Sequence, residues 1–171
     1  MTETATFAAG CFWKVEAAFQ SVPGIVWTEV GYSGGHVANP SYEAVCAGHT
    51  GHAESVRVVF DSEALSYEQL LEVFWSIHDP CSANRQGPDV GSQYRSIIFY
   101  HSDEQRLKAN AARQELERGD RCGGANVATE ITPASAFFRA EEYHQRYYEK
   151  HGMAFRRSSP GCTGKDVREF S

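Results

Sequence analysis

Several features that mark whole classes of proteins are missing from this 171-residue sequence. No apolar run approaches the roughly 18 to 20 residues that a membrane-spanning helix needs. The first residues, "MTETATFAAG", contain no positively charged segment ahead of a long apolar one, so they do not resemble a secretory signal. We therefore expect a soluble, cytoplasmic protein with no membrane partner.

Clustered positive charge is also missing. The formal net charge is −6, and no stripe of Lys and Arg follows the sequence. Because binding to nucleic-acid phosphates requires such clusters, we expect no nucleic-acid partner. The most basic stretch is "FRRSSPGCTGK" near the C-terminus, which is more typical of a solvated tail.

The cysteines do not form an even or regularly spaced set. There are five of them: Cys11, Cys46, Cys81, Cys122 and Cys162. Without an export signal, this pattern argues against a static disulfide framework. Reactive thiols and buried free thiols are then the two alternatives to compare.

What the sequence does contain is the composition of one globular domain, with 42% hydrophobic and 22% charged residues and no internal repeat. Strands are predicted at 5–9, 25–35, 52–60, 94–100 and 126–132, and helices at 14–22, 66–78, 102–118 and 140–150. This alternation favours an α+β fold, a single-domain two-layer α/β sandwich with a mixed sheet packed against helices. We expect a catalytic domain over residues 1–154 and a mobile C-terminal tail over 155–171.

Cys11 lies between the first strand and the first helix, within "ATFAAGCFWKVEAAF". The backbone N–H groups and the positive end of the dipole at a helix N-terminus favour an anion, which would lower the pKa of this thiol. The alternative is a small apolar side chain packed where strand meets helix. Phe12 and Trp13 after it could likewise be core residues or the walls of an apolar pocket.

Seven stretches resemble the peptide methionine sulfoxide reductase A family, in that family's order. They are "GCFW" at 10–13, "GYSGG" at 31–35, "NPSYEAVC" at 39–46, "GHTGHAESVRV" at 48–58, "FWSIHDP" at 74–80, "NRQGPDVGSQYRS" at 84–96 and "AEEYHQRYY" at 140–148. The resemblance therefore covers about residues 7–148, and it implies reduction of the S epimer of methionine sulfoxide, protein-bound or free.

The resemblance also assigns roles to individual residues. It implies that Cys11 is the nucleophile, that Glu54 is the acid that protonates the sulfoxide oxygen, and that Tyr42 and Tyr94 donate hydroxyl hydrogen bonds to it. Without the resemblance, Glu54 would be an ordinary carboxylate at a strand end and both tyrosines ordinary half-buried side chains. To act as an acid near neutral pH, Glu54 must have its pKa raised by burial.

Three further residues take substrate-binding roles by the same resemblance. Phe12 and Trp13 would surround the S-methyl group, and Asp89 would position the substrate at the pocket rim. Taken alone, Asp89 could simply order its glycine-rich loop. The H-x-x-H spacing of His49 and His52 is better explained by a turn that leads into a strand than by a metal, because no second ligand cluster accompanies it.

The thiol that resolves a sulfenic acid on Cys11 is the least determined part of the sequence. Many family members carry a Gly-Tyr-Cys-Gly element after the last helix, where this chain has Cys162 as its only cysteine. Cys162 is our first candidate, Cys81 the second, and an external thiol the third possibility, with Cys46 and Cys122 uninvolved. The chain also has Lys14 where the family usually has Gly.

The resemblance implies no bound cofactor and no metal, and thioredoxin or another dithiol as the external reductant. A monomer is our default expectation. Two other classes of function remain open. One is a cysteine hydrolase that pairs Cys11 with a histidine base, which no histidine motif supports. The other is a binding module for methionine-containing peptides, which would follow if Cys11 were buried and inert.

Overall fold

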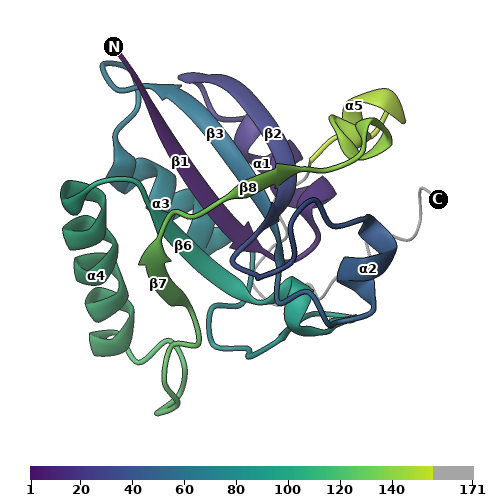
Figure 1. Cartoon of the computed structure of the whole chain (residues 1–171). Coiled ribbons are helices and arrows are strands. Elements are labelled where there is room, and N and C mark those ends of the chain that lie inside the picture. Colours follow the sequence, from purple (N-terminus) through teal and green to yellow (C-terminus); the bar gives the residue numbers. More distant parts are fainter. Residues whose placement is uncertain (156–171) are drawn as a thin grey trace.

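The computed structural model describes residues 1–155, which form a six-stranded sheet with helices (Figure 1). The strands of this sheet are β1 (Thr2–Ala9), β2 (Ile25–Ser33), β3 (Ala53–Asp61), β6 (Ser96–Tyr100), β7 (Glu130–Pro133) and β8 (Phe137–Arg139). The α-helices are α1 (Phe12–Gln20), α2 (Tyr42–Cys46), α3 (Tyr67–Ser76), α4 (Asp103–Arg118) and α5 (Tyr147–Lys150). Two short strands, β4 (Arg85–Gln86) and β5 (Asp89–Val90), form a separate hairpin, and η1 (Ser92–Tyr94) and η2 (Glu142–His144) are 3₁₀ turns.

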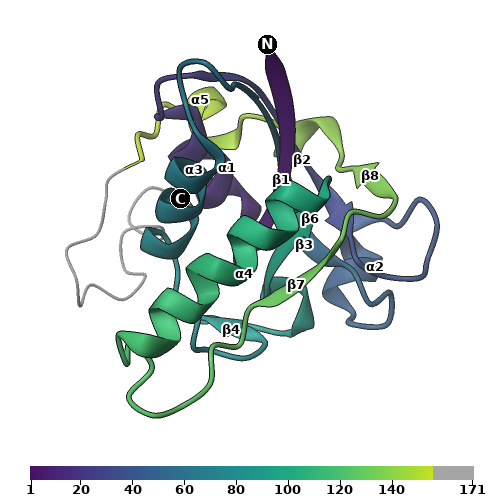
Figure 2. The ribbon, with the colours of Figure 1, turned by 90° about the vertical axis from the view of Figure 1, so that its left-hand side faces the viewer.

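The sheet is mixed, with the strand order β7-β6-β1-β3-β2-β8. Its pairs are antiparallel except for β6 and β7, which run parallel and are connected through α4. Helices α1 and α3 lie behind the sheet in Figure 1 and to its left in Figure 2, and α4 contacts α3. The predicted single-domain α+β sandwich is confirmed.

The core lies between the sheet and the helices, where the sequence patterns placed it. The alternating residues Val56, Val58 and Phe60 of β3 are fully buried. Phe7 of β1 stacks on Phe19 of α1 and on Phe74 of α3, with ring centroids 5.2 Å apart in both pairs. These contacts bury the apolar stripes of both helices, and they bind α1 firmly to the strand that precedes it.

Helix α3 begins where its sequence predicts. The Ser66 hydroxyl accepts a hydrogen bond from the Gln69 backbone N–H at 3.1 Å, and the Gln69 side chain accepts one from the Ser66 backbone N–H at 2.9 Å. This reciprocal capping box satisfies two backbone donors that have no partner inside the helix.

Several segments differ from the predictions. The elements that were not predicted include α2, within 36–51, the β4–β5 hairpin, and β8, which follows the strand expected to be the last. The predicted helix at 140–150 is wrong, because the chain divides into η2 and α5 at Arg146, whose φ is +52°. The buried Glu16 carboxylate of α1 accepts a hydrogen bond from the Arg146 backbone N–H at 2.7 Å, which stabilises this interruption.

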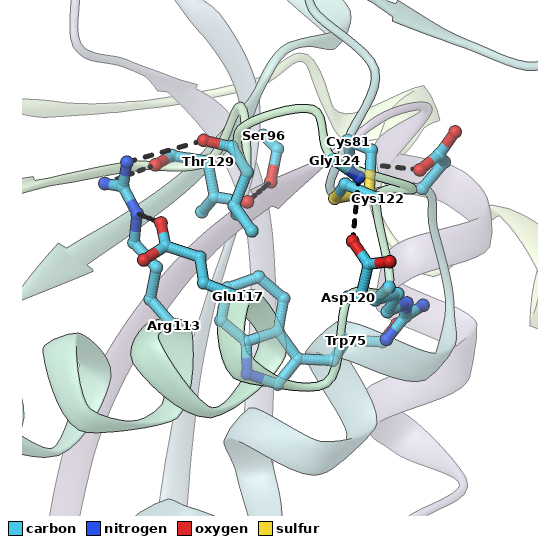
Figure 3. Close-up of a disulfide and its surroundings, with 12 residues drawn as sticks. Trp75, Cys81, Ser96, Arg113, Glu117, Asp120, Cys122, Gly124 and Thr129 are labelled. Atoms are coloured by element: carbon cyan, nitrogen blue, oxygen red, sulfur yellow. Dashed lines mark hydrogen bonds and ion pairs between the residues drawn. A yellow bond between two sulfur atoms is a disulfide. The ribbon is translucent and has the colours of Figure 1, made fainter.

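A disulfide joins Cys81 to Cys122, with their Cα atoms 5.5 Å apart (Figure 3). The expectation that the chain has no static disulfide is therefore wrong. The two cysteines are 41 residues apart in the sequence, and they meet because the segments after α3 and α4 lie side by side. A sequence spacing could not show this.

Among residues 1–155, no helix has the length and apolar character needed to span a bilayer. The predicted tail over 155–171 lies, apart from Phe155, outside the described residues.

Candidate active site

Cys11 is the N-cap residue of α1, directly after β1. Gly10 joins the two elements with φ +101°, a backbone conformation that glycine adopts without a steric penalty. A Cβ atom at this position would also approach the Gln86 Cβ atom to 3.0 Å. The predicted junction is confirmed: the thiol is half-buried at a helix N-terminus, and a second segment of chain packs against the turn before it.

Glu54, near the start of β3, lies beside this nucleophile because β3 and β1 are neighbours in the sheet. The side chain is only 2% exposed. Its Oε1 atom accepts a hydrogen bond from the Phe12 backbone N–H at 3.2 Å, and its Oε2 atom has no hydrogen-bond partner among the described residues. The carboxyl group is therefore anchored at the helix N-terminus by one oxygen, and the other is left for a ligand.

Burial raises the pKa of the Glu54 carboxyl to about 8, against the lowering effect of the Phe12 N–H, and the negative charge of Asp89 adds to the rise. The predicted upward shift is confirmed. A carboxyl group with this pKa is largely protonated at neutral pH, and it can therefore donate a proton there.

The pKa of the Cys11 thiol does not follow its prediction. Burial and the negative charge of Glu54 raise the pKa to about 12, and they outweigh the lowering by the Trp13 and Lys14 backbone N–H groups. The expected lowering at the helix N-terminus is present but is the smaller effect. Without substrate, the site therefore holds a neutral thiol beside a protonated carboxyl group at neutral pH.

Tyr42, at the start of α2, and Tyr94, at the end of η1, are both half-buried. Burial raises the pKa of each hydroxyl, and negative charge at Glu54 raises both further. Each hydroxyl therefore keeps its proton and can donate a hydrogen bond. The Tyr94 hydroxyl also responds to the charges of Cys11 and Asp89, whereas the Tyr42 hydroxyl hydrogen-bonds with the Cys46 thiol.

Phe12 and Trp13 form an aromatic wall together with residues from the C-terminal part of the domain. The Trp13 indole N–H donates to His144 Nδ1 at 2.8 Å, and the indole stacks on Tyr147 with ring centroids 3.8 Å apart. The Phe12 ring lies 5.1 Å from the His144 ring and 5.8 Å from the Tyr32 ring. Trp13 is half-buried and Phe12 fully buried, so both contribute to the core as well as to the wall.

The sequence predictions missed a group of residues that supports this site. Glu141 accepts a hydrogen bond from the Tyr32 hydroxyl at 2.9 Å and another from the Tyr42 backbone N–H at 3.0 Å, so it fixes the start of α2. His144 orients Trp13 by accepting its indole N–H. Both belong to "AEEYHQRYY", a stretch whose resemblance to a family was visible but whose residues received no role.

The two histidines of "HTGHAES" do not form part of a metal cluster in the described structure, where no group of three or more potential ligands is found. His49 is exposed. His52 is buried, where its Nδ1 atom accepts from the Gly35 N–H at 3.0 Å and its Nε2–H donates to the Val37 carbonyl at 2.6 Å. It therefore holds the loop that leads from β2 towards α2.

The candidate resolving thiols differ in their state and in whether the structure describes them. Cys81, the second candidate, is bonded to Cys122 in the structure. Cys162 lies outside the described residues. Within residues 1–155, the free cysteines are Cys11 and the exposed Cys46.

Together these groups place a thiol, a proton donor, two hydroxyl donors and an aromatic wall around one position. A model of the family "Peptide methionine sulfoxide reductase" matches residues 3–169. The chain belongs to this family.

Individual relatives agree with this assignment. Peptide methionine sulfoxide reductase MsrA of Methanosarcina mazei is 60% identical over 151 residues, which cover 88% of this chain and 71% of the relative. The MsrA of Methanothermobacter thermautotrophicus is 60% identical over 149 residues, 87% of this chain and 88% of the relative. The crystal structure of Mxr1 from Saccharomyces cerevisiae in reduced form has a TM-score of 0.82 at 35% identity, and the match covers 91% of this chain and 89% of Mxr1.

This chain is therefore a methionine sulfoxide reductase, an oxidoreductase that converts methionine sulfoxide to methionine. The hydrolase and binding-module alternatives are set aside by this assignment.

Proposed function

We propose that the enzyme reduces the S epimer of methionine sulfoxide, free or within proteins, by direct attack of Cys11. The observation that carries the proposal is the buried Glu54 carboxyl group. It adjoins Cys11, has a pKa of about 8, and presents an Oε2 atom with no partner among the described residues. A sulfoxide oxygen that accepts the Glu54 proton would supply the missing partner.

The reaction balances within the site. Glu54 gives its proton to the sulfoxide oxygen and takes up the proton of the Cys11 thiol, as that sulfur attacks the sulfoxide sulfur. Attack forms a bond between the two sulfur atoms. The oxygen then moves to Cys11, and both this sulfur–sulfur bond and the bond between oxygen and the substrate sulfur break as methionine leaves. The substrate sulfur gains two electrons, Cys11 loses two and becomes a sulfenic acid, and no net proton is needed.

Transfer of the thiol proton to Glu54 also explains how a thiol with a raised pKa can react. When the carboxyl group has passed its proton to the substrate, it becomes a base next to Cys11. The Tyr42 and Tyr94 hydroxyls, protonated in the free site, would donate to the sulfoxide oxygen and stabilise the negative charge on it until its protonation is complete.

The site would distinguish the two epimers because the oxygen and the methyl group of the sulfoxide need different surroundings. The oxygen needs the hydrogen-bond donors, while the methyl group needs the apolar faces of Phe12 and Trp13. Asp89, on β5, would hold the rest of the substrate at the rim. With the sulfur facing Cys11, exchange of methyl and oxygen would put the methyl against the donors and leave the oxygen in the apolar wall without a hydrogen bond.

We further propose that Cys162 resolves the sulfenic acid, forming a disulfide with Cys11 and releasing water, and that a thioredoxin-type dithiol then reduces this disulfide. The yeast protein Mxr1 has also been solved in complex with Trx2, which supports a protein dithiol as the reductant. A reducing compartment such as the cytoplasm would keep that dithiol available. Residues 1–154 would carry the groups that reduce the sulfoxide and residues 155–171 the resolving thiol, and the enzyme would act as a monomer without a bound cofactor.

The test is an incubation with an equal mixture of the two methionine sulfoxide epimers and dithiothreitol, each epimer being followed by chiral chromatography. We expect the native protein to consume the S epimer alone and Cys11→Ser to consume neither. Consumption of both epimers at similar rates would contradict the proposed stereochemistry, and persistence of both would contradict the proposed reaction. A Cys162→Ser variant should retain a single turnover without reductant, with one methionine formed per protein.

A further inference from the structure

The segment over 79–91, here called the rim loop, carries Asp89 and leads directly to Tyr94. Of its residues, Pro80 alone is buried. A segment with so little buried apolar surface opens at a low cost in free energy unless other links hold it. The disulfide Cys81–Cys122 is such a link, because Cys81 lies at the start of the rim loop.

The other end of the disulfide is fixed to the body of the domain (Figure 3). Arg121, next to Cys122, donates from its guanidinium group to the Trp75 carbonyl of α3 at 2.6 Å. The Ala128 N–H donates to the Pro80 carbonyl at 2.7 Å, directly before Cys81. The covalent bond therefore joins the start of the rim loop to chain that α3 and α4 already hold.

Two hydrogen bonds connect the segment beside the disulfide with the residue of the rim loop that contacts the Cys11 turn. The Asp79 N–H donates to the Gln86 side-chain oxygen at 2.8 Å, and the Gln86 side-chain amide donates to the Asp79 carbonyl at 2.7 Å. Gln86 lies against Gly10, the residue before Cys11, and its backbone pairs with Asp89 in the β4–β5 hairpin. Gln86 is thus the point where the rim loop contacts the turn that presents the thiol.

We propose that the Cys81–Cys122 disulfide is a positioning device for substrate, which holds the rim loop and its Asp89 against the Cys11 turn. A dithiol that reduces it supplies two electrons and two protons, giving two thiols and becoming a disulfide itself. Reduction then releases the rim loop and weakens sulfoxide binding, whereas Cys11 and Glu54 stay in place on α1 and β3. This inference rests on the proposed function, because it assigns Asp89 to substrate binding.

The first test measures binding without turnover. Full-length Cys11→Ser, with the Cys81–Cys122 disulfide verified by mass spectrometry, is titrated calorimetrically with a peptide that contains S-methionine sulfoxide, before and after reduction by dithiothreitol. We expect reduction to weaken Kd at least fivefold. In the matched control Cys11→Ser/Cys81→Ser/Cys122→Ser, which keeps Cys46 and Cys162, Kd should have the weaker value under both conditions. An equal Kd for the oxidised and reduced forms would overturn the inference.

The second test breaks the same path without touching a cysteine. Gln86→Ala keeps the Cβ atom that lies against Gly10 but removes both hydrogen bonds to Asp79. In single-turnover reactions without reductant, with the Cys81–Cys122 disulfide verified, we expect the half-saturating peptide concentration to rise at least fivefold. The single-turnover rate constant should change less than twofold, at an unchanged melting temperature. An unchanged half-saturating concentration would show that the rim loop is not positioned through this contact, and it would contradict the inference.

The two proposals fail in different ways. If the native protein turns over neither epimer, the proposed function is wrong, and the positioning role falls with it. If the native protein turns over the S epimer while Kd is insensitive to the disulfide and the half-saturating concentration is insensitive to Gln86, the positioning role alone is wrong. A disulfide that only stabilised the fold would lower the melting temperature on removal and leave Kd unchanged.

Discussion

The two sides of the active site are built in different ways. Cys11 and Glu54 belong to α1 and β3, whose side chains form the hydrophobic core, and a backbone hydrogen bond at the start of α1 links them. Asp89 belongs to the rim loop, and Tyr94 follows it. The rim loop is little buried, and it is held by the hydrogen bonds of Asp79 with Gln86 and by a disulfide. The groups that exchange protons and electrons are thus fixed by the core. The rim loop, which would contact the substrate, is held by a disulfide and a few hydrogen bonds.

The largest effect that we expect concerns the rigid side. Cys11→Ser should lower kcat/KM for the S epimer by at least about 10³-fold, because a serine hydroxyl cannot accept the sulfoxide oxygen as a thiol does. Steady-state kinetics with dithiothreitol measure this. The circular dichroism spectrum should match that of the native protein, and substantial remaining turnover would mean that another thiol is the nucleophile.

Glu54→Gln should lower kcat/KM by roughly 10²- to 10⁴-fold, the usual range for loss of a general acid. The same substitution should also change how the free energy of unfolding depends on pH. The folded state keeps this proton up to a pKa of about 8, against an ordinary pKa of 4.5, so native stability falls as pH rises between these values. From pH 5 to pH 8, this group should cost the native protein roughly 3 to 4 kcal/mol.

Urea unfolding at the two pH values measures that cost. The amide that Glu54→Gln introduces does not ionise, so the variant should lose less stability than the native protein over the same interval. Equal losses for both proteins would show that Glu54 is not held protonated by burial.

The next smaller effect should come from the hydroxyl groups of Tyr42 and Tyr94. Tyr42→Phe or Tyr94→Phe alone should lower kcat/KM about tenfold, the loss of one hydrogen bond to a developing charge, because the other hydroxyl remains. The double variant should lose more than either single one. If neither single variant nor the double variant changes kcat/KM, the hydroxyls do not contact the sulfoxide oxygen.

The smallest effect on the chemical step should come from removal of the disulfide that holds the rim loop. Cys81→Ser/Cys122→Ser should reduce the free energy of unfolding by up to roughly 4 kcal/mol, from the loop entropy of a 41-residue separation. Its rate constant for methionine formation in a single turnover without reductant should nevertheless stay within about twofold of the native value, well below the effects expected for Cys11 and Glu54. Denaturant unfolding and single-turnover kinetics, both without reductant, measure the two quantities, and a large loss of this rate constant would contradict the separation between the two sides.

The same division explains what could be predicted from the sequence. The positions of Cys11 and Glu54 follow from local patterns, namely a strand that ends in glycine before a helix and an alternating strand whose first residues resemble a family motif. The buried alternation of β3 and the capping box of α3 are equally local, and the structure has both.

The rest depended on contacts between distant segments. The disulfide joins cysteines with no informative spacing, and the interruption at Arg146 is stabilised by the Glu16 carboxylate from the other end of the chain. The pKa of Cys11 was predicted from the helix terminus alone, but burial and Glu54 decide it. The links of Glu141 to Tyr32 and Tyr42 are also long-range, so its motif could be recognised without revealing its role.

The most direct test of the central claim, that Glu54 supplies the proton for attack by Cys11, is the pH dependence of kcat/KM for the S epimer. Because the carboxyl pKa is raised to about 8 and that of the thiol to about 12, we expect the native rate to fall as pH rises through about 8. Glu54→Gln should be slow and should lack this fall. A native rate that instead rises through pH 8 to 9, or a fall that persists in Glu54→Gln, would contradict the assignment of Glu54 as the proton donor.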